Sequence, residues 1–235
     1  MYAEAVRCEI ACTMAIFERQ RAMRSSGTPS PARRGTATQV LVVDERAAVR
    51  AGVRGVLSGA PGLQVESAGS WGSAVKQAGS GNVDLCLVDY SLARGGTGMF
   101  LACRLKRLQR PPLVVLYAEY VDGFLAGAAK VAGADGLVCQ HAEADELAQV
   151  LRRVARGERQ FSAIPPSAMY ELCKRLHASD RPIVTMAAHD TRREHISEVM
   201  GISDEWLATR TWAILEQLHS QLASPTPAAA LAVSA

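Results

Sequence analysis

The sequence lacks the long apolar run that a membrane-spanning helix requires. No stretch of the chain approaches the roughly 18 consecutive apolar residues of such a span. The first residues carry Glu4 and Glu9 among apolar neighbours, and no hydrophobic segment is followed by a small-residue cleavage site, so they make a poor signal peptide. We therefore expect a soluble protein that stays in the cytoplasm.

A disulfide framework and metal-ligand spacing are also missing. The six cysteines are scattered and several lie inside apolar runs, which favours buried free thiols in a reducing cytoplasm. Cys8 and Cys12 are helically spaced but have no second pair of ligands nearby, and the five histidines show no metal-ligand pattern. Because no nucleophile–base pair or phosphate-cradling loop is recognisable either, we do not expect an enzyme.

The chain has an ordinary soluble composition with an uneven distribution of charge. Hydrophobic residues make up 49% of the 235 residues, enough to bury a core in one large or two small domains. The net charge is +3 in residues 1–36 (6 basic, 3 acidic), +2 in residues 37–160 (14 basic, 12 acidic) and −2 in residues 161–235 (6 basic, 8 acidic). We expect a disordered basic extension at 1–36 and a disordered tail at 222–235.

Strand-like and helix-like patterns alternate through the middle of the chain. Short apolar runs bounded by turn residues predict strands at 39–43, 63–67, 83–88, 113–117 and 136–139. Apolar residues at helical spacing predict helices at 47–58, 70–78, 99–108, 121–132 and 144–156. Five strands separated by five helices require parallel pairing with right-handed crossovers, so we expect an α/β, doubly wound, five-stranded sheet.

Carboxylates stand at the ends of two of these strands. Asp44 and Glu45 follow the first apolar run, and Asp89 follows the third. Sites of open α/β sheets lie just outside the carboxyl ends of the strands, so the three side chains are expected to meet there. They would repel one another unless a hard cation held them, and Mg²⁺ is the candidate cofactor. The alternative is that each carboxylate is an N-cap of the next helix.

The residues at these positions resemble a known family. Four ordered blocks resemble the receiver domain of response regulators of the NarL/FixJ class, over residues 37–160: 42–45, 87–89, 133–136 and 151–158. The resemblance implies that Asp89 is the phosphoacceptor. It also implies that Mg²⁺ is bound by Asp44, Glu45 and Asp89 together with the backbone carbonyl of Ser91, and that a sensor histidine kinase is a partner in a two-component system.

Three positions depart from the family pattern. Tyr117 stands where the family has the Thr or Ser that hydrogen-bonds the phosphoryl oxygen, and Gln140 stands where it has a Lys. Leu137 replaces the aromatic switch residue. Because an amide gives no charge assistance to a phosphoryl group, we expect an atypical receiver whose phospho-switch is degenerate.

The C-terminal part resembles a second module of the same class. After a linker at 161–171, residues 172–221 resemble a small, all-α LuxR-type helix-turn-helix domain, with a scaffold helix and turn at 195–203 and a recognition helix at 204–218. The resemblance implies a homodimer that binds double-stranded DNA. The expected DNA contacts are Thr209, Arg210, Thr211, Arg192 and Arg193.

The expected reading surface is poor in basic residues, and this leaves a second hypothesis open. Arg210 is the only basic residue of 204–218, and the electrostatic attraction that supports DNA affinity is weak in a region of charge −2. The alternative is a protein-interaction regulator that pairs with another regulator or a kinase. Trp206 either fills the core beside Leu207 or binds a partner.

Overall fold

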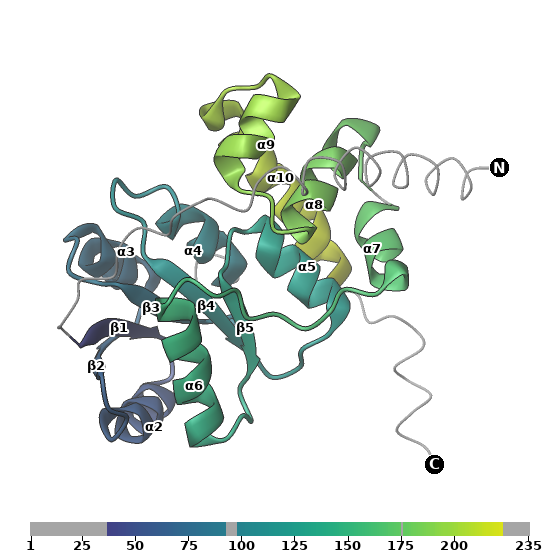
Figure 1. Ribbon diagram of the computed structural model, residues 1–235. Coiled ribbons are helices and arrows are strands. Elements are labelled where there is room, and N and C mark those ends of the chain that lie inside the picture. Colours follow the sequence, from purple (N-terminus) through teal and green to yellow (C-terminus); the bar gives the residue numbers. More distant parts are fainter. Residues whose placement is uncertain (1–36, 93–97, 175, 223–235) are drawn as a thin grey trace, which may run out of the picture.

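The computed structural model describes residues 37–92, 98–174 and 176–222 (Figure 1). The expectations for residues 1–36, for Cys8 and Cys12, and for the tail beyond residue 222 lie outside this part of the chain. Within it, no helix is long and apolar enough to cross a membrane.

A five-stranded parallel sheet forms the centre of the molecule, with strand order β2-β1-β3-β4-β5. The strands are β1 (Thr38–Val43), β2 (Leu63–Ala68), β3 (Leu85–Asp89), β4 (Leu113–Ala118) and β5 (Gly136–Cys139). The helices that alternate with them are α2 (Ala47–Ser58), α3 (Trp71–Gly79), α4 (Gly98–Leu105), α5 (Gly123–Val131) and α6 (Ala144–Ala155). The predicted α/β fold is therefore confirmed.

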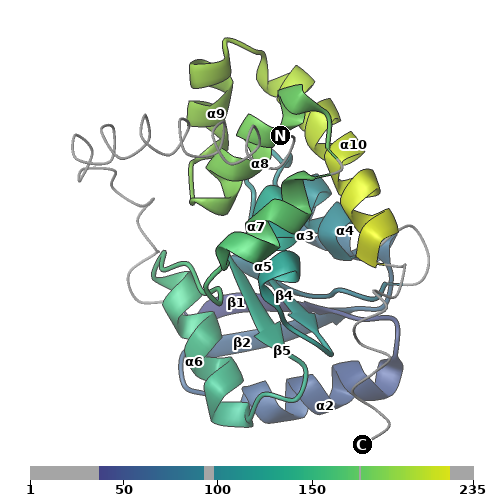
Figure 2. The same cartoon turned by 90° about the vertical axis from the view of Figure 1, so that its right-hand side faces the viewer.

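The alternation of side chains along each strand divides the core into two layers. In β1, Val40 and Val42 face α2 and α6, whereas Leu41 and Val43 face α3, α4 and α5. Figure 2 shows α2 and α6 below the sheet, with α5 and the C-terminal helices above it. Because both faces are covered, strands such as β3 and β4 read as continuous apolar runs, whereas the edge strand β2 carries the exposed Gln64 and Glu66.

Side-chain caps explain the starts of two helices. The Ser70 hydroxyl accepts a hydrogen bond from the Ser73 N–H, so α3 begins one residue later than predicted. Asp122 accepts from the Leu125 N–H in the same way, which moves the start of α5 from the predicted 121 to Gly123.

The C-terminal part is helical. It contains α7 (Pro166–Cys173), the 3₁₀ turn η1 (Ala178–Asp180), α8 (Arg181–Ala188), α9 (Arg193–Met200) and α10 (Asp204–Leu222). The linker predicted over 161–171 is shorter in the structure, since α7 already begins at Pro166, where a proline suits the first turn of a helix. Gly201 ends α9 in the left-handed region (φ 64°), and the Ser203 hydroxyl caps α10 by accepting from the Trp206 N–H.

These helices pack against the sheet domain over α4 and α5. The ring of Phe100 on α4 lies 4.8 Å from the ring of Trp212 on α10, measured between centroids. Lys130 on α5 pairs with Asp190, and Leu172 of α7 lies so close to Gly127 that a Cβ there would be 2.2 Å from its Cδ1. One hydrophobic core cluster includes Leu101 of α4 and Leu215 of α10, so the core is continuous across the two parts.

The chain that joins the two parts follows the free edge of the sheet. Gln160 forms a parallel bridge with Gly136: the Leu137 N–H donates to the Gln160 carbonyl at 2.8 Å, and the Gln160 N–H donates to the Asp135 carbonyl at 3.0 Å. The edge of β5 is therefore occupied at this position.

Candidate functional site

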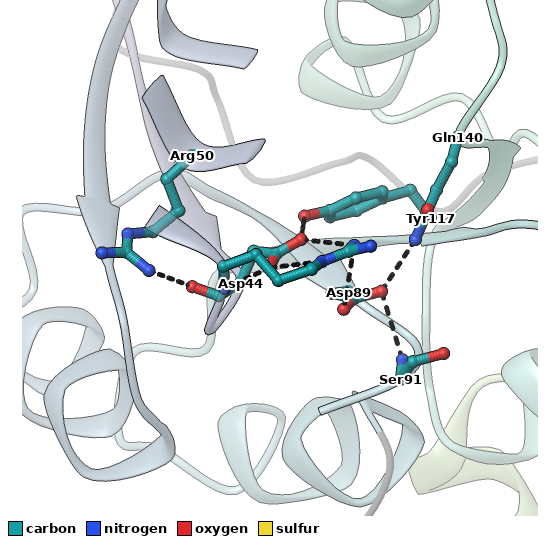
Figure 3. A network of polar contacts seen from close by, with 7 residues as sticks. Asp44, Arg50, Asp89, Ser91, Tyr117 and Gln140 are labelled. Carbon is teal, nitrogen blue, oxygen red and sulfur yellow. Dashed lines mark hydrogen bonds and ion pairs between the residues drawn. The ribbon is translucent and has the colours of Figure 1, made fainter. Parts of the chain in front are cut away.

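Asp44 and Asp89 meet at the carboxyl edge of the sheet. Strands β1 and β3 are neighbours in register, with Val43 opposite Val88, so the residues that follow these two valines lie side by side. Both carboxylates are buried, at 0% and 3% exposure. Figure 3 shows them facing one another, with Tyr117, Gln140 and Ser91 around them. The predicted pairing of these two positions is thus seen in the structure.

Arg46 lies between the two carboxylates. Its Nε and Nη2 donate to Asp44 Oδ1 and Oδ2 at 3.1 and 2.8 Å, and the same Nη2 lies 3.4 Å from Asp89 Oδ2. Its backbone N–H also donates to Asp44 Oδ1, at 2.7 Å, which places Arg46 immediately before the first residue of α2. One guanidinium therefore bridges both acids.

Of the three positions that the sequence marked as departures from the family pattern, two contact the site and one does not. The Tyr117 hydroxyl donates to Asp44 Oδ2 at 2.5 Å, because β4 directs this side chain to the α2/α6 face of the sheet. Gln140, just beyond β5, donates from Nε2 to Asp89 Oδ1 at 2.9 Å. Leu137 is buried in the opposite layer, at 7% exposure. Tyr117 therefore hydrogen-bonds Asp44, and of these three residues only Gln140 contacts Asp89, the expected phosphoacceptor.

The two carboxyl groups have different electrostatic surroundings. For Asp44, burial raises the pKa, but the hydrogen bonds from Arg46 and Tyr117 outweigh it, and the net pKa is lowered. For Asp89, burial is again the largest cause and the pKa is raised, helped by the negative charge of Asp44 and opposed by the Ser91 N–H. Burial and the bond to Asp44 also raise the pKa of Tyr117, so its hydroxyl stays a donor.

The residues at the site do not fit the Mg²⁺ centre that the sequence predicted. Each of the four carboxylate oxygens of Asp44 and Asp89 already faces an N–H or O–H donor. Among the described residues, no group of three His, Cys, Asp or Glu side chains could hold a metal, so Glu45, which is partly exposed, does not complete such a group with Asp44 and Asp89. Ser91 contributes its N–H to Asp89. The positive group at this site is Arg46, which sequence reasoning did not single out.

The expected DNA contacts are placed less favourably than predicted. Arg210 forms two bonds with the fully buried Asp180, Nε to Oδ1 at 2.5 Å and Nη2 to Oδ2 at 2.7 Å. Thr211 is buried at 4% exposure, and its hydroxyl donates to the Leu207 carbonyl. Thr209 is exposed. Of these three residues of α10, Thr209 is the one with an exposed side chain.

Two basic residues lie at the start of α9. Arg192 is exposed, and Arg193 donates from Nη2 to the Asp204 carbonyl at 3.2 Å. Trp206 is 45% exposed, so it does not fill the core beside Leu207. The second tryptophan of α10, Trp212, is the one that packs, and it packs against the sheet domain.

Comparison with known proteins places the chain in a class. Residues 40–152 match the family model "Response regulator receiver domain". Response regulator UvrY of Escherichia coli (strain K12) is 25% identical over 191 residues, which cover 77% of this chain and 87% of that protein. Nitrate/nitrite response regulator protein NarP of the same strain is 29% identical over 128 residues, which cover 54% of this chain and 59% of that protein.

A solved structure gives the same fold. The two-component response regulator of the LuxR family from Aurantimonas sp. SI85-9A1 is 23% identical and covers 59% of this chain and 97% of its own, with a TM-score of 0.51. Residues 40–152 therefore form a response-regulator receiver domain. Beyond this domain, the chain is similar to response regulators over most of its length, as its motifs predicted.

Proposed function

We propose that the chain is a DNA-binding transcription regulator whose receiver does not use phosphorylation of Asp89 as its working signal. A single observation carries this proposal: the group that reaches Asp89 from the end of β5 is the neutral amide of Gln140. A phosphoryl group on Asp89 would add negative charge beside a carboxylate without a charged donor from β5 to compensate it.

The Tyr117 hydroxyl supports the same proposal. A phosphoryl-sensing hydroxyl must be free to turn toward Asp89, but the Tyr117 hydroxyl is buried and bonded to Asp44. Breaking that bond would leave a buried acceptor with fewer donors, which costs about 1–3 kcal/mol. The residue is therefore better suited to hold the site in one arrangement than to switch it.

DNA binding is supported by the geometry of the C-terminal helices. A helix of eight residues, a left-handed glycine and a serine-capped helix follow one another in α9, Gly201 and α10, which is the arrangement of a helix-turn-helix. In this proposal Thr209, Arg192 and Arg193 contact phosphates or bases, and a homodimer binds double-stranded DNA in the cytoplasm. We propose no enzymatic activity, and a histidine kinase partner is not required for DNA binding.

The experiment combines a salt series with one substitution in the receiver. Binding of the intact chain to duplex DNA should weaken with salt, with a slope of log K against log salt of about −0.9 per phosphate contact. Asp89→Asn should bind DNA as the wild type does, with or without a small-molecule phosphodonor. Two results would refute the claim that phosphorylation of Asp89 is not the working signal. One is a loss of DNA binding in Asp89→Asn, and the other is a change of DNA affinity on adding the phosphodonor that is seen only in the wild type.

The second hypothesis is a protein-interaction regulator that has lost strong DNA binding. It is favoured by α10, in which Arg210 is held by Asp180 and Thr211 is buried, while Glu205 and Glu216 are exposed. Absence of DNA binding at low salt, together with a stable complex with another response regulator or kinase, would support this alternative. A salt-dependent DNA affinity that falls in Arg192→Ala would contradict it.

A further inference from the structure

The acidic site of this receiver contains its own cation. Two buried carboxylates, Asp44 and Asp89, lie at the edge of the sheet. Without a counter-charge, their like charges would repel each other. The guanidinium of Arg46 touches both, at 2.8 Å from Asp44 Oδ2 and 3.4 Å from Asp89 Oδ2. It supplies the attraction that a bound metal would otherwise supply.

The oxygen atoms leave little for a metal to bind. Asp44 Oδ1 accepts from the backbone N–H and the Nε of Arg46, and Oδ2 accepts from Arg46 Nη2 and the Tyr117 hydroxyl. Asp89 Oδ1 accepts from the Ser91 N–H and Gln140 Nε2. A divalent cation needs these lone pairs for itself, so its binding would break several hydrogen bonds at once.

A second arginine adds to the positive surroundings. Arg50, one turn further along α2, donates from Nη1 to the backbone carbonyl of Asp44 at 2.6 Å. Figure 3 shows Arg50 on the side of Asp44 away from Asp89. The N-cap and the first turn of α2 therefore direct two guanidinium groups at Asp44, and a metal ion entering the site would meet repulsion from both.

We propose that Arg46 is the resident cation of this receiver site, that the wild-type chain binds no divalent metal there, and that removing Arg46 turns the same carboxylates into a metal site. This inference deepens the proposed function, because a receiver that needs no Mg²⁺ is independent of the cofactor as well as of the phosphoryl group. Its test needs no DNA.

The measurement uses Mn²⁺ as the probe, because free Mn²⁺ gives an electron paramagnetic resonance signal that is lost on binding. The intact wild-type chain, freed of metal with a chelator, should leave the Mn²⁺ signal unchanged at millimolar concentrations. Arg46→Ala should bind Mn²⁺ about tenfold or more tightly than the wild type, since two buried acids then lack their counter-charge. Excess Mg²⁺ should release the Mn²⁺.

Three further variants locate the effect. Arg46→Lys keeps a positive charge and should leave the signal as in the wild type. Arg54→Ala removes an exposed arginine from α2 that no described contact joins to the carboxylates, and it too should bind no Mn²⁺. Arg46→Ala combined with Asp89→Asn should lose the binding gained by the single variant, which assigns that binding to this site.

Each outcome decides the inference. Mn²⁺ binding by the wild type that disappears in Asp89→Asn would overturn it, because Arg46 would then move aside for a metal. Folded Arg46→Ala without Mn²⁺ binding would overturn the claim that removing Arg46 turns these carboxylates into a metal site. If Arg46→Ala does not fold, the wild-type measurement still decides. Failure of the DNA experiments above would refute the proposed function and leave these results untouched.

Discussion

Replacing Arg210 by alanine would leave the carboxylate of Asp180 buried without its cation. The pair joins the start of α8 to the middle of α10 through two charge-assisted bonds, and Asp180 itself has no exposed surface. Removing one partner of a fully buried pair costs about 3–5 kcal/mol of unfolding free energy. The Arg210 side chain is 32% exposed, so water can partly replace it, and about 2–3 kcal/mol is the better expectation here.

The assay is urea unfolding followed by circular dichroism and by tryptophan fluorescence, since α10 carries Trp206 and Trp212. A loss of this size corresponds to about 5–10 °C in melting temperature for a chain of this length. Thr209→Ala, on the exposed side of the same helix, is the matched control and should change stability by less than about 0.5 kcal/mol.

A double-mutant cycle separates the pair from its surroundings. Asp180→Asn, Arg210→Ala and the double variant should show an interaction free energy of about 1 kcal/mol or more. If Arg210→Ala instead unfolds at the wild-type midpoint, the reasoning fails, and Arg210 is available for the DNA contact that the sequence suggested. Any loss of DNA affinity in this variant is interpretable only at temperatures where it remains folded.

Three other substitutions and one reagent test the packing and chemistry of the described residues. Gly127→Ala would push α5 and α7 apart and should lower the unfolding free energy by about 1–3 kcal/mol, as a thermal melt can show. Gly52→Ala adds a Cβ that meets nothing within 4 Å, and it should stabilise α2 by about 0.5–1 kcal/mol. Tyr117→Phe removes a donor from a buried carboxylate and should lower the unfolding free energy by about 1–2 kcal/mol; an unchanged urea midpoint would show that the arginine alone satisfies that oxygen. Burial raises the pKa of Cys86 to about 12, so iodoacetamide at about pH 8 should label the half-buried Cys139 and spare Cys86, as peptide mass spectrometry can show.

Elements of the receiver could be predicted because strands such as β4 and β5 are buried on both faces. The runs at 113–117 and 136–139 are apolar at every position, and the structure has β4 at Leu113–Ala118 and β5 at Gly136–Cys139. Parallel pairing alone was enough to predict that Asp44 and Asp89 meet at the carboxyl edge of the sheet. The helix ends differ by one to three residues: the helix predicted to end at 108 ends at Leu105, and caps such as Ser70 decide the boundary at helix starts.

The roles of the charged side chains could not be predicted in the same way. Arg46 is next to Asp44 and Glu45 in the sequence, and that adjacency was an available signal, but its contact with Asp89 exists only after β3 is paired with β1. Asp180 lies 30 residues from Arg210, and no local pattern links them. The partners of long charged side chains depend on the tertiary arrangement, which the periodicity of apolar residues in the sequence does not predict.

The bonded connection at Gln160 has a consequence for how this protein can be divided. A fragment that stops at the end of α6 would uncover the edge of β5 and, at the same time, the apolar surface of α5 that contacts Leu172. Both are templates for unwanted association, one through backbone pairing and the other through hydrophobic contact. The receiver and the C-terminal helices should therefore be produced as one polypeptide, and a displacement of β5 would be transmitted directly to the segment that leads into α7.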